Sequence, residues 1–316
     1  MIDLDKILEG AVTAGIAGHV RPDGDAVGSC LGFAGYLREA YPGLKVNVHL
    51  ETVQEEFRFL KGADLVITDA SEDIAYDVFF CLDCADVQRL GDNIRYFRSA
   101  AHTVCIDHHI SNPLFAQENL VRPDASSTSE LICDLIPKEA LTRPVAEALY
   151  LGIVHDTGVF QYSCTSSHTM ELAGKLMDTG IDYPRIVADT FFARSFPQTK
   201  AMGKVLSRSE LYLDGQLILG SITCREISEL GLRPADLNGI VEQLRNTAGP
   251  CAAAFLYETR PSEWRISLRT GEPVDGAKIA SHFGGGGHVR AAGCTLTGTL
   301  DEVTEKLLKQ IALQLS

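Results

Sequence analysis

The sequence predicts an α/β protein in which a doubly wound, mostly parallel sheet is followed by a smaller α/β domain, with the active site in the cleft between them. Three observations predict this fold. Short apolar runs alternate with helical patterns in the first half of the chain, which is typical of βαβ units. Near residue 195 the pattern changes to strand pairs joined by tight turns. Polar clusters follow the apolar runs, at the sheet edge where such folds bind ligands.

The first domain is expected over residues 1–190, with a connector over 191–204. Its strand-like apolar runs cover residues 15–19, 44–50, 64–67, 77–82 and 102–106. Helical patterns separate the runs, notably at 26–40 and 126–136. A helical stretch from about 144 to 193 would complete the domain.

The second domain is expected over residues 205–316. SELYLDGQLILGSIT alternates apolar residues around Asp214 and Gly215, which is a strong hairpin signal. AAAFLYETRPSEWRISLRT predicts a second hairpin that turns at residues 260–263. An amphipathic pattern predicts a final helix over 300–315.

Composition limits the possible functions. The chain of 316 residues is 45% hydrophobic and 22% charged, which is typical of a globular protein with room for two domains. Its formal net charge of −14 argues against a basic face that grips long nucleic acid. Cys81 and Cys84 form a C-x-x-C without a second pair, so we interpret them as buried thiols rather than a zinc or redox site. With no signal-peptide pattern and no apolar run of about 18 residues, a cytoplasmic protein is expected.

The first polar cluster, GHVRPDGDAVGS, presents His19, Asp23 and Asp25. Gly24 permits tight backbone geometry between the two aspartates. Gly28 and Ser29 are expected to begin the next helix, whose N-terminus would favour an anion. The alternative for this segment alone is an ordinary polar turn.

The second cluster is FFCLDCAD, in which Asp83 ends an apolar run. Its position in the middle of the sheet makes it the natural carboxylate to bridge two metal ions. Alternatively it caps a helix, a role for which Asp86 is equally available.

The third cluster, Asp107-His108-His109, follows the run HTVCI. Adjacent side chains on an extended chain point in opposite directions, so the two histidines are expected to differ in role, one ligating metal and the other facing substrate. Asp107 could orient a ligating imidazole. The alternative is a set of surface loop residues.

A fourth candidate, Asp156, lies in GIVHDTGVF after another apolar stretch, and His155 beside it is left out of the site. All four clusters are expected where strands end in loops. Carboxylates and imidazoles gathered there would repel one another unless cations neutralised them. Such ligands suit two divalent ions such as Mn²⁺. The residues therefore predict hydrolysis of a phosphate ester at a site with two metals.

In the second domain, four glycines stand between His282 and His288. Their backbone amides could surround an anion, and His288 adds a donor that can carry charge. A flexible loop is the alternative. Arg269 ends the run RISLR and could pair with a phosphate through its planar fork, although a solvated arginine at a strand end is equally compatible with the sequence.

Taken together, RPDGDAVGS, IDHH, DTG and GGGGH, in this order, resemble the DHH phosphoesterase family with its DHH-associated C-terminal domain. The resemblance extends over nearly the entire chain. Its short, stand-alone members degrade very short oligoribonucleotides and dephosphorylate 3′-phosphoadenosine 5′-phosphate (pAp), and relatives cleave cyclic dinucleotides or their linear products.

The resemblance also implies roles for residues. It implies six metal ligands, with Asp83 bridging: His19, Asp23, Asp25, Asp83, His108 and Asp156. His109 would contact the scissile phosphate as a catalytic residue, with Asp107 beside it. The substrate would be held by Arg269, Gly285, Gly286, Gly287 and His288. The cofactors would be two divalent ions, Mn²⁺ first, with Mg²⁺ or Co²⁺ as alternatives.

We therefore expect a metal-dependent phosphoesterase that acts on oligoribonucleotides of a few nucleotides, on pAp, or on both. A phosphodiesterase for cyclic or linear dinucleotides is the alternative, and a non-catalytic nucleotide-binding protein is a remote one. Long duplex nucleic acid and membranes are not expected as partners. A homodimer is expected only from the resemblance.

Overall fold

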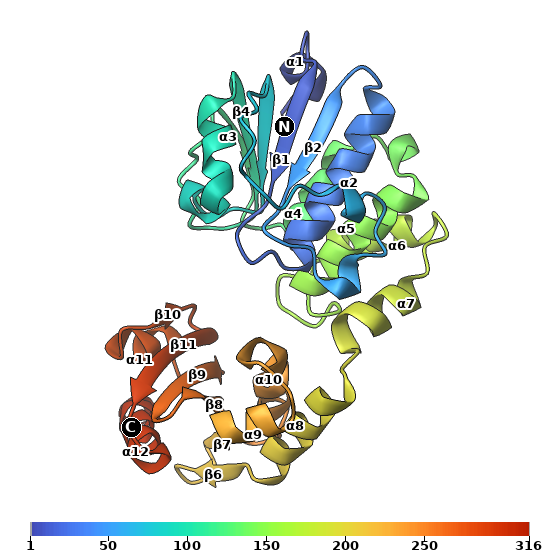
Figure 1. The fold of residues 1–316 in the computed structure, drawn as a ribbon. Coiled ribbons are helices and arrows are strands. Elements are labelled where there is room, and N and C mark those ends of the chain that lie inside the picture. The colour runs from blue at the N-terminus through green and yellow to red at the C-terminus, as the bar shows by residue number, and fades with distance from the viewer. Residues whose placement is uncertain (1, 316) are drawn as a thin grey trace. The chain divides into compact units, whose positions relative to one another are not determined.

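A five-stranded sheet with the order β2-β1-β3-β4-β5 forms the centre of the first half of the chain, and every neighbouring pair in it is parallel (Figure 1). Its strands are β1 (Thr13–Ala17), β2 (Lys45–His49), β3 (Val78–Leu82), β4 (His102–Asp107) and β5 (Glu118–Val121). This computed structural model describes residues 2–315. The chain runs outward from β1 to β2 and then returns to β3 on the other side of β1. Such a reversal leaves a crevice at the carboxyl ends of β1 and β3.

Helices cover both faces of this sheet, as a doubly wound fold requires. The helices are α1 (Leu4–Ile7), α2 (Gly24–Ala40), α3 (Ile94–Ser99), α4 (Thr128–Leu135), α5 (Arg143–Asp156), α6 (Ser167–Met177) and α7 (Tyr183–Val187). Shorter helical turns are η1 (Glu55–Phe57), η2 (Ala63–Leu65), η3 (Val87–Asn93), η4 (Lys138–Ala140) and the π-turn η5 (Ala188–Phe192).

The central strand β3 contributes to a core on each face. Val78 and Phe80 pack in the large cluster that includes residues of α2, α4 and α5. Phe79 and Cys81 pack on the opposite face with residues of η3 and α3. Because successive side chains of a strand alternate between faces, a run of five apolar residues is buried throughout. Cys81 and Cys84 are fully buried free thiols, as the sequence predicts.

One expectation for this part of the chain is wrong, and one strand was not foreseen. Residues 64–67 do not form a strand; Ala63–Leu65 is the short turn η2, and Ile67 makes only an isolated bridge to His49. The left-handed Gly62 (φ 87°) turns the chain at this point. The edge strand β5 was not expected, because its sequence ENLV is half polar and only partly buried.

The close contact between α2 and α5 is set by glycines. A Cβ at Gly28 would overlap the carbonyl oxygen of Ala148 and would lie 2.9 Å from the Gly152 nitrogen. Helix α2 begins at Gly24, so Gly28 lies one turn inside it and packs against α5 instead of starting the helix as the sequence suggested. The close approach brings the first turn of α2 next to the last turn of α5.

A six-stranded mixed sheet with the order β10-β11-β9-β8-β7-β6 forms the second half. Its strands are β6 (Glu210–Tyr212), β7 (Leu217–Ile222), β8 (Ala252–Arg260), β9 (Glu263–Thr270), β10 (Gly286–Gly287) and β11 (Ala291–Thr297). Its helices are α8 (Phe196–Ser207), α9 (Cys224–Glu229), α10 (Ile240–Arg245), α11 (Gly276–His282) and α12 (Leu300–Leu315), with the turn η6 (Pro234–Leu237). The antiparallel pairs β6–β7 and β8–β9 confirm both predicted hairpins.

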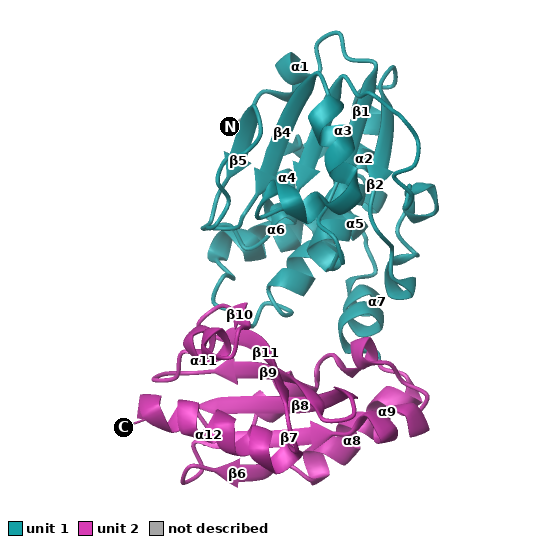
Figure 2. Cartoon of the chain, turned by 60° about the vertical axis from the view of Figure 1, so that its left-hand side comes forward, with its two compact units in different colours: residues 1–193 teal, residues 194–316 magenta. Residues whose placement is uncertain are grey.

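The chain divides into two compact units between Ala193 and Arg194 (Figure 2). Each sheet has its own core. In the second unit, one cluster packs α12 and α11 on one face of the sheet, and another packs α8 and α10 on the other. Across residues 2–315, each helix is too short or too polar to cross a lipid bilayer.

Candidate metal centre

Six side chains from four segments meet at the carboxyl end of the first sheet. His19 follows β1, Asp83 follows β3 directly, and His108 follows β4 directly. Asp23 is the N-cap of α2 and Asp25 lies in its first turn. Asp156 is the last residue of α5, so the expectation that it lies at a strand end is wrong. The crevice beside β1 and β3 therefore gathers candidate ligands from strand ends and helix ends together.

The six residues form two groups of three. One group contains His19, Asp23 and Asp83, and in it one nitrogen or oxygen of each residue lies within 4.8 Å of the others. The second group meets the same criterion and contains Asp25, His108 and Asp156. A third combination overlaps both groups, because it joins Asp83 of the first and His108 of the second with His109. Two adjacent cation positions fit this arrangement.

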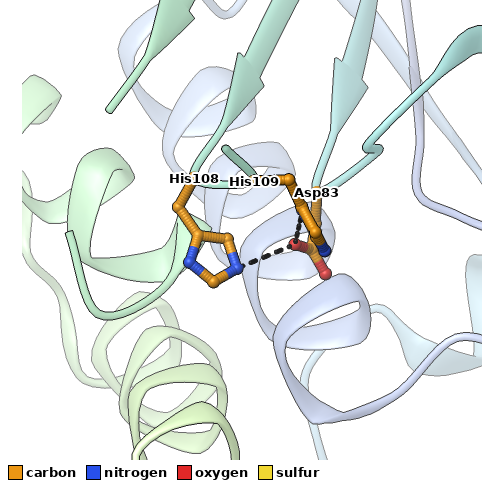
Figure 3. Close-up of side chains that lie close together, drawn as sticks. All are labelled: Asp83, His108 and His109. Carbon is orange, nitrogen blue, oxygen red and sulfur yellow. Dashed lines mark ion pairs between the residues drawn. The ribbon is translucent and has the colours of Figure 1, made fainter. Parts of the chain in front are cut away.

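The carboxylate of Asp83 faces both groups. Its Oδ2 lies 3.5 Å from Nε2 of His19. Its Oδ1 lies 3.5 Å from Nε2 of His108, and Figure 3 shows this second contact. Thr128 donates to the same Oδ1 at 3.2 Å. A carboxylate with one oxygen toward each group has the geometry needed to bridge two ions.

The imidazole of His19 is oriented for metal binding. Its Nδ1 lies 2.9 Å from the carbonyl oxygen of Val20, which accepts hydrogen bonds only, so Nδ1 carries a proton. The other nitrogen, Nε2, faces Asp23 at 3.6 Å and Asp83. A bond of this kind at the far nitrogen is the usual way that proteins fix a ligating histidine.

The N-terminus of α4 holds the fully buried Asp25. The backbone amide of Thr128 donates to its Oδ2 at 2.7 Å, and the amide of Ser129 donates to its Oδ1 at 2.9 Å. Amides at a helix N-terminus stabilise a carboxylate. Sequence reasoning missed these two residues, although the segment Ser126–Glu130 has the composition of a helix start.

The carboxylates of the site favour positive charge on the neighbouring histidines. Burial would lower the pKa of His19, but hydrogen bonds to Asp23 and Asp83 outweigh it and raise the pKa to about 11. Burial acts in the same way on His108, where Asp156 and Asp83 raise the pKa to about 12. The carboxylates therefore draw protons onto imidazoles that would otherwise be neutral.

The carboxylates respond in two ways. Burial, together with the charges of Asp83 and Asp156, raises the pKa of Asp25 well above its usual value. Burial also raises the pKa of Asp156 to about 6. Burial opposes ionisation of Asp83 too, but its bonds with His108 and His19 outweigh that effect and lower its pKa. Divalent cations would take the place of these protons, and the imidazole and carboxylate donors fit them.

The two neighbouring histidines both face Asp83, so the expectation that they point in opposite directions is wrong. Their ring centroids lie 4.8 Å apart. The extended strand β4 ends at Asp107, and the chain then turns, with the amide of Asn112 donating to the carbonyl oxygen of His109. The alternation of an extended chain therefore no longer applies at residues 108 and 109.

Asp107 orients His109 and not the candidate ligand His108. The Oδ1 of this buried carboxylate lies 2.7 Å from Nδ1 of His109, and it accepts from the backbone amide of His108 at 2.9 Å. Because Asp107 accepts, Nδ1 of His109 carries the proton. This bond outweighs burial and raises the pKa of His109. The arrangement allows His109 to carry positive charge beside the two groups.

His155, which the sequence reasoning left out, supports the loop that carries Asp23 and Asp25. A Cβ at Gly24 would overlap its ring, so the ring lies directly against the turn between the two aspartates. The ring also packs edge-on against Phe57 and Phe191. Burial lowers its pKa to about 4, so His155 is neutral near pH 7. Because His155 is far from Gly24 in the sequence, its contact with this loop could be found only in the structure.

The predicted substrate residues of the second unit have partners of their own. Arg269 forms an ion pair with Glu242 at 2.7 Å. In the glycine-rich segment, Gly285 donates to the carbonyl oxygen of Ala280 and His288 donates to that of Ala291. These two amides are therefore not directed at an anion, in contrast to the expectation from the sequence.

Close packing explains the glycines of this segment. Gly286 and Gly287 pair with β11 as the short strand β10. A Cβ at Gly285 would overlap the carbonyl oxygen of Gly293, and one at Gly287, where φ is 136°, would lie 2.6 Å from that of Ala291. The imidazole of His288 remains exposed and is available to a ligand.

Comparisons with known families match most of the chain. Residues 13–153 match the N-terminal domain of the DHH family, and residues 214–316 match the DHHA1 domain. These two matches cover the two units separately.

Individual relatives match over almost the full length. The chain is 29% identical over 319 residues to a bifunctional oligoribonuclease and PAP phosphatase NrnA of Thermus thermophilus, covering 98% of this chain and 92% of the relative. It is 30% identical over 286 residues to the protein of the same name from Bacillus subtilis, covering 88% and 87%. Among solved structures, an exopolyphosphatase-related protein from Bacteroides fragilis matches with a TM-score of 0.88 and 27% identity, covering 99% of this chain and 96% of that one.

Proposed function

Because the chain belongs to the DHH family, we propose that it is a metal-dependent phosphoesterase that hydrolyses short oligoribonucleotides and pAp. The observation that carries the proposal is the division of six side chains into two groups of three potential ligands. The names of the relatives from Thermus thermophilus and Bacillus subtilis support these substrates. The net charge of −14 favours small anions over long nucleic acid.

The proposed cofactors are two divalent cations, with Mn²⁺ first and Mg²⁺ or Co²⁺ as alternatives. One would be held by His19, Asp23 and Asp83, and the other by Asp25, His108 and Asp156, with Asp83 shared between them. When bound, such cations supply Lewis acidity, which makes water more acidic and offsets the charge of a phosphate. Imidazole and carboxylate donors in this mixture suit ions of this hardness.

His109 is the proposed catalytic residue that contacts the scissile phosphate. Asp107 holds the proton on Nδ1, which leaves Nε2 as the atom that can donate to a phosphate oxygen. The same bond raises the pKa of His109 and so favours the charged imidazolium. A positive donor beside the phosphorus would stabilise the negative charge that develops on the non-bridging oxygens.

The second unit is proposed to hold the remaining phosphate or nucleotide of the substrate. Arg269 would exchange its partner Glu242 for a phosphate, which its guanidinium can bind through two parallel hydrogen bonds. Within Gly285, Gly286, Gly287 and His288, the exposed imidazole is the group best able to bind an anion, because the amides of Gly285 and His288 already have acceptors.

A panel of substrates tests the proposal directly. Hydrolysis of pAp, a diribonucleotide, cyclic di-AMP and pyrophosphate is measured with Mn²⁺, Mg²⁺ and Co²⁺. We expect turnover of pAp and the diribonucleotide. Preferred turnover of cyclic di-AMP would favour the alternative of a cyclic dinucleotide phosphodiesterase, and nucleotide binding without turnover of any compound would indicate a binding protein.

A variant in the site, compared with a control outside it, tests the role of Asp83. Asp83→Asn should reduce kcat on the order of a hundredfold or more, because it removes the charge shared by both groups. Asp86→Asn is the matched control, since Asp86 only caps η3 through the amides of Gln88 and Arg89. An Asp83→Asn enzyme as active as Asp86→Asn would contradict the site. A homodimer and a cytoplasmic location stay predictions.

A further inference from the structure

Asn112 lies three residues beyond His109, and both the nitrogen and the oxygen of its side-chain amide are hydrogen-bonded. Its Nδ2 donates to Oδ2 of Asp107 at 2.7 Å and to the carbonyl oxygen of Cys84 at 3.0 Å. Its Oδ1 accepts from the backbone amide of Leu114 at 2.8 Å. Because the Asp107 carboxylate and the Cys84 carbonyl accept and the Leu114 amide donates, the orientation of the side-chain amide is unambiguous.

We propose that Asn112 is a positioning residue that sets both the metal ligand Asp83 and the substrate-facing His109. The inference rests on the proposed function, because it assigns a role within the same site. The hydrogen bonds of the Asn112 side chain go to neither of these two side chains. It acts through the backbone next to one and through the carboxylate that holds the other.

The first line of action runs through Asp107. The Oδ1 of Asp107 is used by His109 and by the amide of His108, and Oδ2 is held by Asn112. Asp107 is fully buried, so an oxygen without a donor would be costly. Without Asn112 the carboxylate would be free to rotate toward another donor, and the bond that orients His109 would be lost with it.

The second line of action runs through the backbone at Asp83. This residue has φ of 54°, a left-handed conformation that persists only where the surroundings hold it. Its amide donates to the carbonyl oxygen of Ile106 at 3.1 Å. Asn112 donates to the carbonyl oxygen of the following residue, Cys84. These two bonds fix the chain on both sides of Asp83, and so aim its carboxylate between His19 and His108.

A residue that only ties a loop together gives a matched control within the same unit. Asn119 in β5 is partly buried like Asn112. Its Nδ2 donates to the carbonyl oxygen of Ala116 at 2.7 Å, and its Oδ1 accepts from the Ala116 amide at 3.2 Å. Its side chain makes similar bonds to a loop, but none to the six candidate ligands, Asp107 or His109. Asn119→Ala therefore measures the cost of losing such a clamp alone.

The test compares Asn112→Ala, Asn112→Ser and Asn119→Ala in the full chain. Four quantities are measured: kcat and KM for pAp with Mn²⁺, Mn²⁺ affinity by titration with electron paramagnetic resonance, and Tm. We expect Asn112→Ala to lower kcat and Mn²⁺ affinity by about 10- to 100-fold, with KM changed much less. Asn112→Ser keeps one donor and should lose less of both. Asn119→Ala should lower only Tm.

The proposal is overturned if kcat and Mn²⁺ affinity of Asn112→Ala stay within about twofold of the parent while Tm falls as in Asn119→Ala, since a twofold change lies below the loss expected for an orienting partner. If Asn112→Ala does not fold, Asn112→Ser is held to the same criterion. Failure of the proposed function would give a different result, because the parent enzyme itself would not hydrolyse pAp or short RNA. The Mn²⁺ titration still decides the role of Asn112 in that case.

Discussion

Asp83 combines an unfavourable backbone conformation with a buried carboxylate. A left-handed φ costs a non-glycine residue roughly 1–2 kcal/mol, and Asp83 adopts it at 54° while its carboxylate is nearly fully buried among two histidines. The surrounding backbone bonds supply the compensation. Backbone strain of this kind is more often found at functional sites than in ordinary loops, which agrees with the position of Asp83 between the two groups of candidate ligands.

Gly24 gives a prediction about the loop of Asp23 and Asp25. In Gly24→Ala the new Cβ would overlap the ring of His155 and lie 2.6 Å from its Cβ, so the loop must move. We expect Mn²⁺ affinity and kcat to fall by about tenfold or more, as for other residues that orient ligands. Isothermal titration and initial rates measure both.

Gly43→Ala is the control for this substitution, because nothing lies within 4 Å of a Cβ at that exposed position. The double variant Gly24→Ala/His155→Ala removes the ring and should recover part of the loss. Equal metal affinity in Gly24→Ala and Gly43→Ala would show that His155 does not shape the loop.

The histidines give a prediction about protons. Without metal, the raised pKa values of His19, about 11, and His108, about 12, mean that both are charged at pH 7. Metal binding needs neutral imidazoles, so it should release at least the two protons of these histidines, and the apparent affinity should rise with pH. Titration calorimetry in two buffers with different ionisation enthalpies counts the protons released.

The same shifts set the pH dependence of stability without metal. A histidine whose folded pKa is raised stabilises the fold fully below its unfolded pKa, about 6.5, and this contribution is lost as pH rises toward the folded value near 11 or 12. The metal-free protein should therefore lose stability with rising pH, while Mn²⁺ should stabilise it most at high pH. Metal binding without proton release would contradict the charged state of both histidines.

At the scale of elements, the site depends on how closely α2 and α5 approach. Asp25 lies in the first turn of α2, and Asp156 ends α5. A Cβ at Gly152 would overlap Oγ of Ser129 and would lie 2.5 Å from Oδ1 of Asp25. The glycines on the two helices thus serve both packing and the placement of the carboxylates.

Gly28→Ala tests this contact. The added methyl would overlap the carbonyl oxygen of Ala148, and overpacking of this kind costs about 1–3 kcal/mol. We expect the free energy of unfolding in urea to fall by that amount and Mn²⁺ affinity to fall with it, because both helices carry candidate ligands.

Gly174→Ala in α6 is the comparison, since a Cβ there meets nothing within 4 Å and alanine is favoured in helices by about 1 kcal/mol. It should be neutral or stabilising. If Gly28→Ala were as stable as Gly174→Ala, the helices would have room to separate, and the close approach would not be required.

Elements with a strong pattern could be predicted from the sequence, and those decided by tertiary contacts could not. The run at β3 is apolar throughout and the run at β4 is apolar from Val104 to Ile106, and the turn at Asp214-Gly215 identifies its hairpin. Residues 64–67 were wrongly expected to form a strand, because the three apolar residues after Asp64 suffice for a strand pattern but not for pairing. The glycines near His288 suggested an anion site, whereas their close approach to β11 involves a segment that sequence spacing does not reveal.

At the scale of the molecule, the two units carry different kinds of groups. The first contains all six candidate ligands, and the second contains Arg269 and His288. The chemistry is therefore proposed to depend on the first unit and the recognition of the substrate's remaining phosphate on the second. A net charge of −14 makes such local cations necessary for an anionic substrate.

Arg269→Ala tests the role of the second unit. Loss of a charge-assisted hydrogen bond to a phosphate should raise KM for pAp by about tenfold or more, with kcat little changed because the ligands are untouched. The exposed Arg265 on the same strand gives the control Arg265→Ala. Equal KM values for the two variants would exclude Arg269 from substrate binding.

The order of motifs allowed the family and the six candidate ligands to be predicted, but not how those ligands divide. The division into two groups depends on the strand order β2-β1-β3 and on the helix end that carries Asp156. Supporting residues such as Thr128, His155 and Asn112 are distant from their partners in the chain, so no local pattern identifies them. Their roles follow only from contacts in three dimensions.

Anomalous diffraction from crystals grown with manganese tests the central claim most directly. Two peaks are predicted at the manganese edge, one within ligand distance of His19, Asp23 and Asp83 and the other within ligand distance of Asp25, His108 and Asp156. A single peak elsewhere, or no peak with these side chains turned apart, would contradict the proposal of a two-metal phosphoesterase.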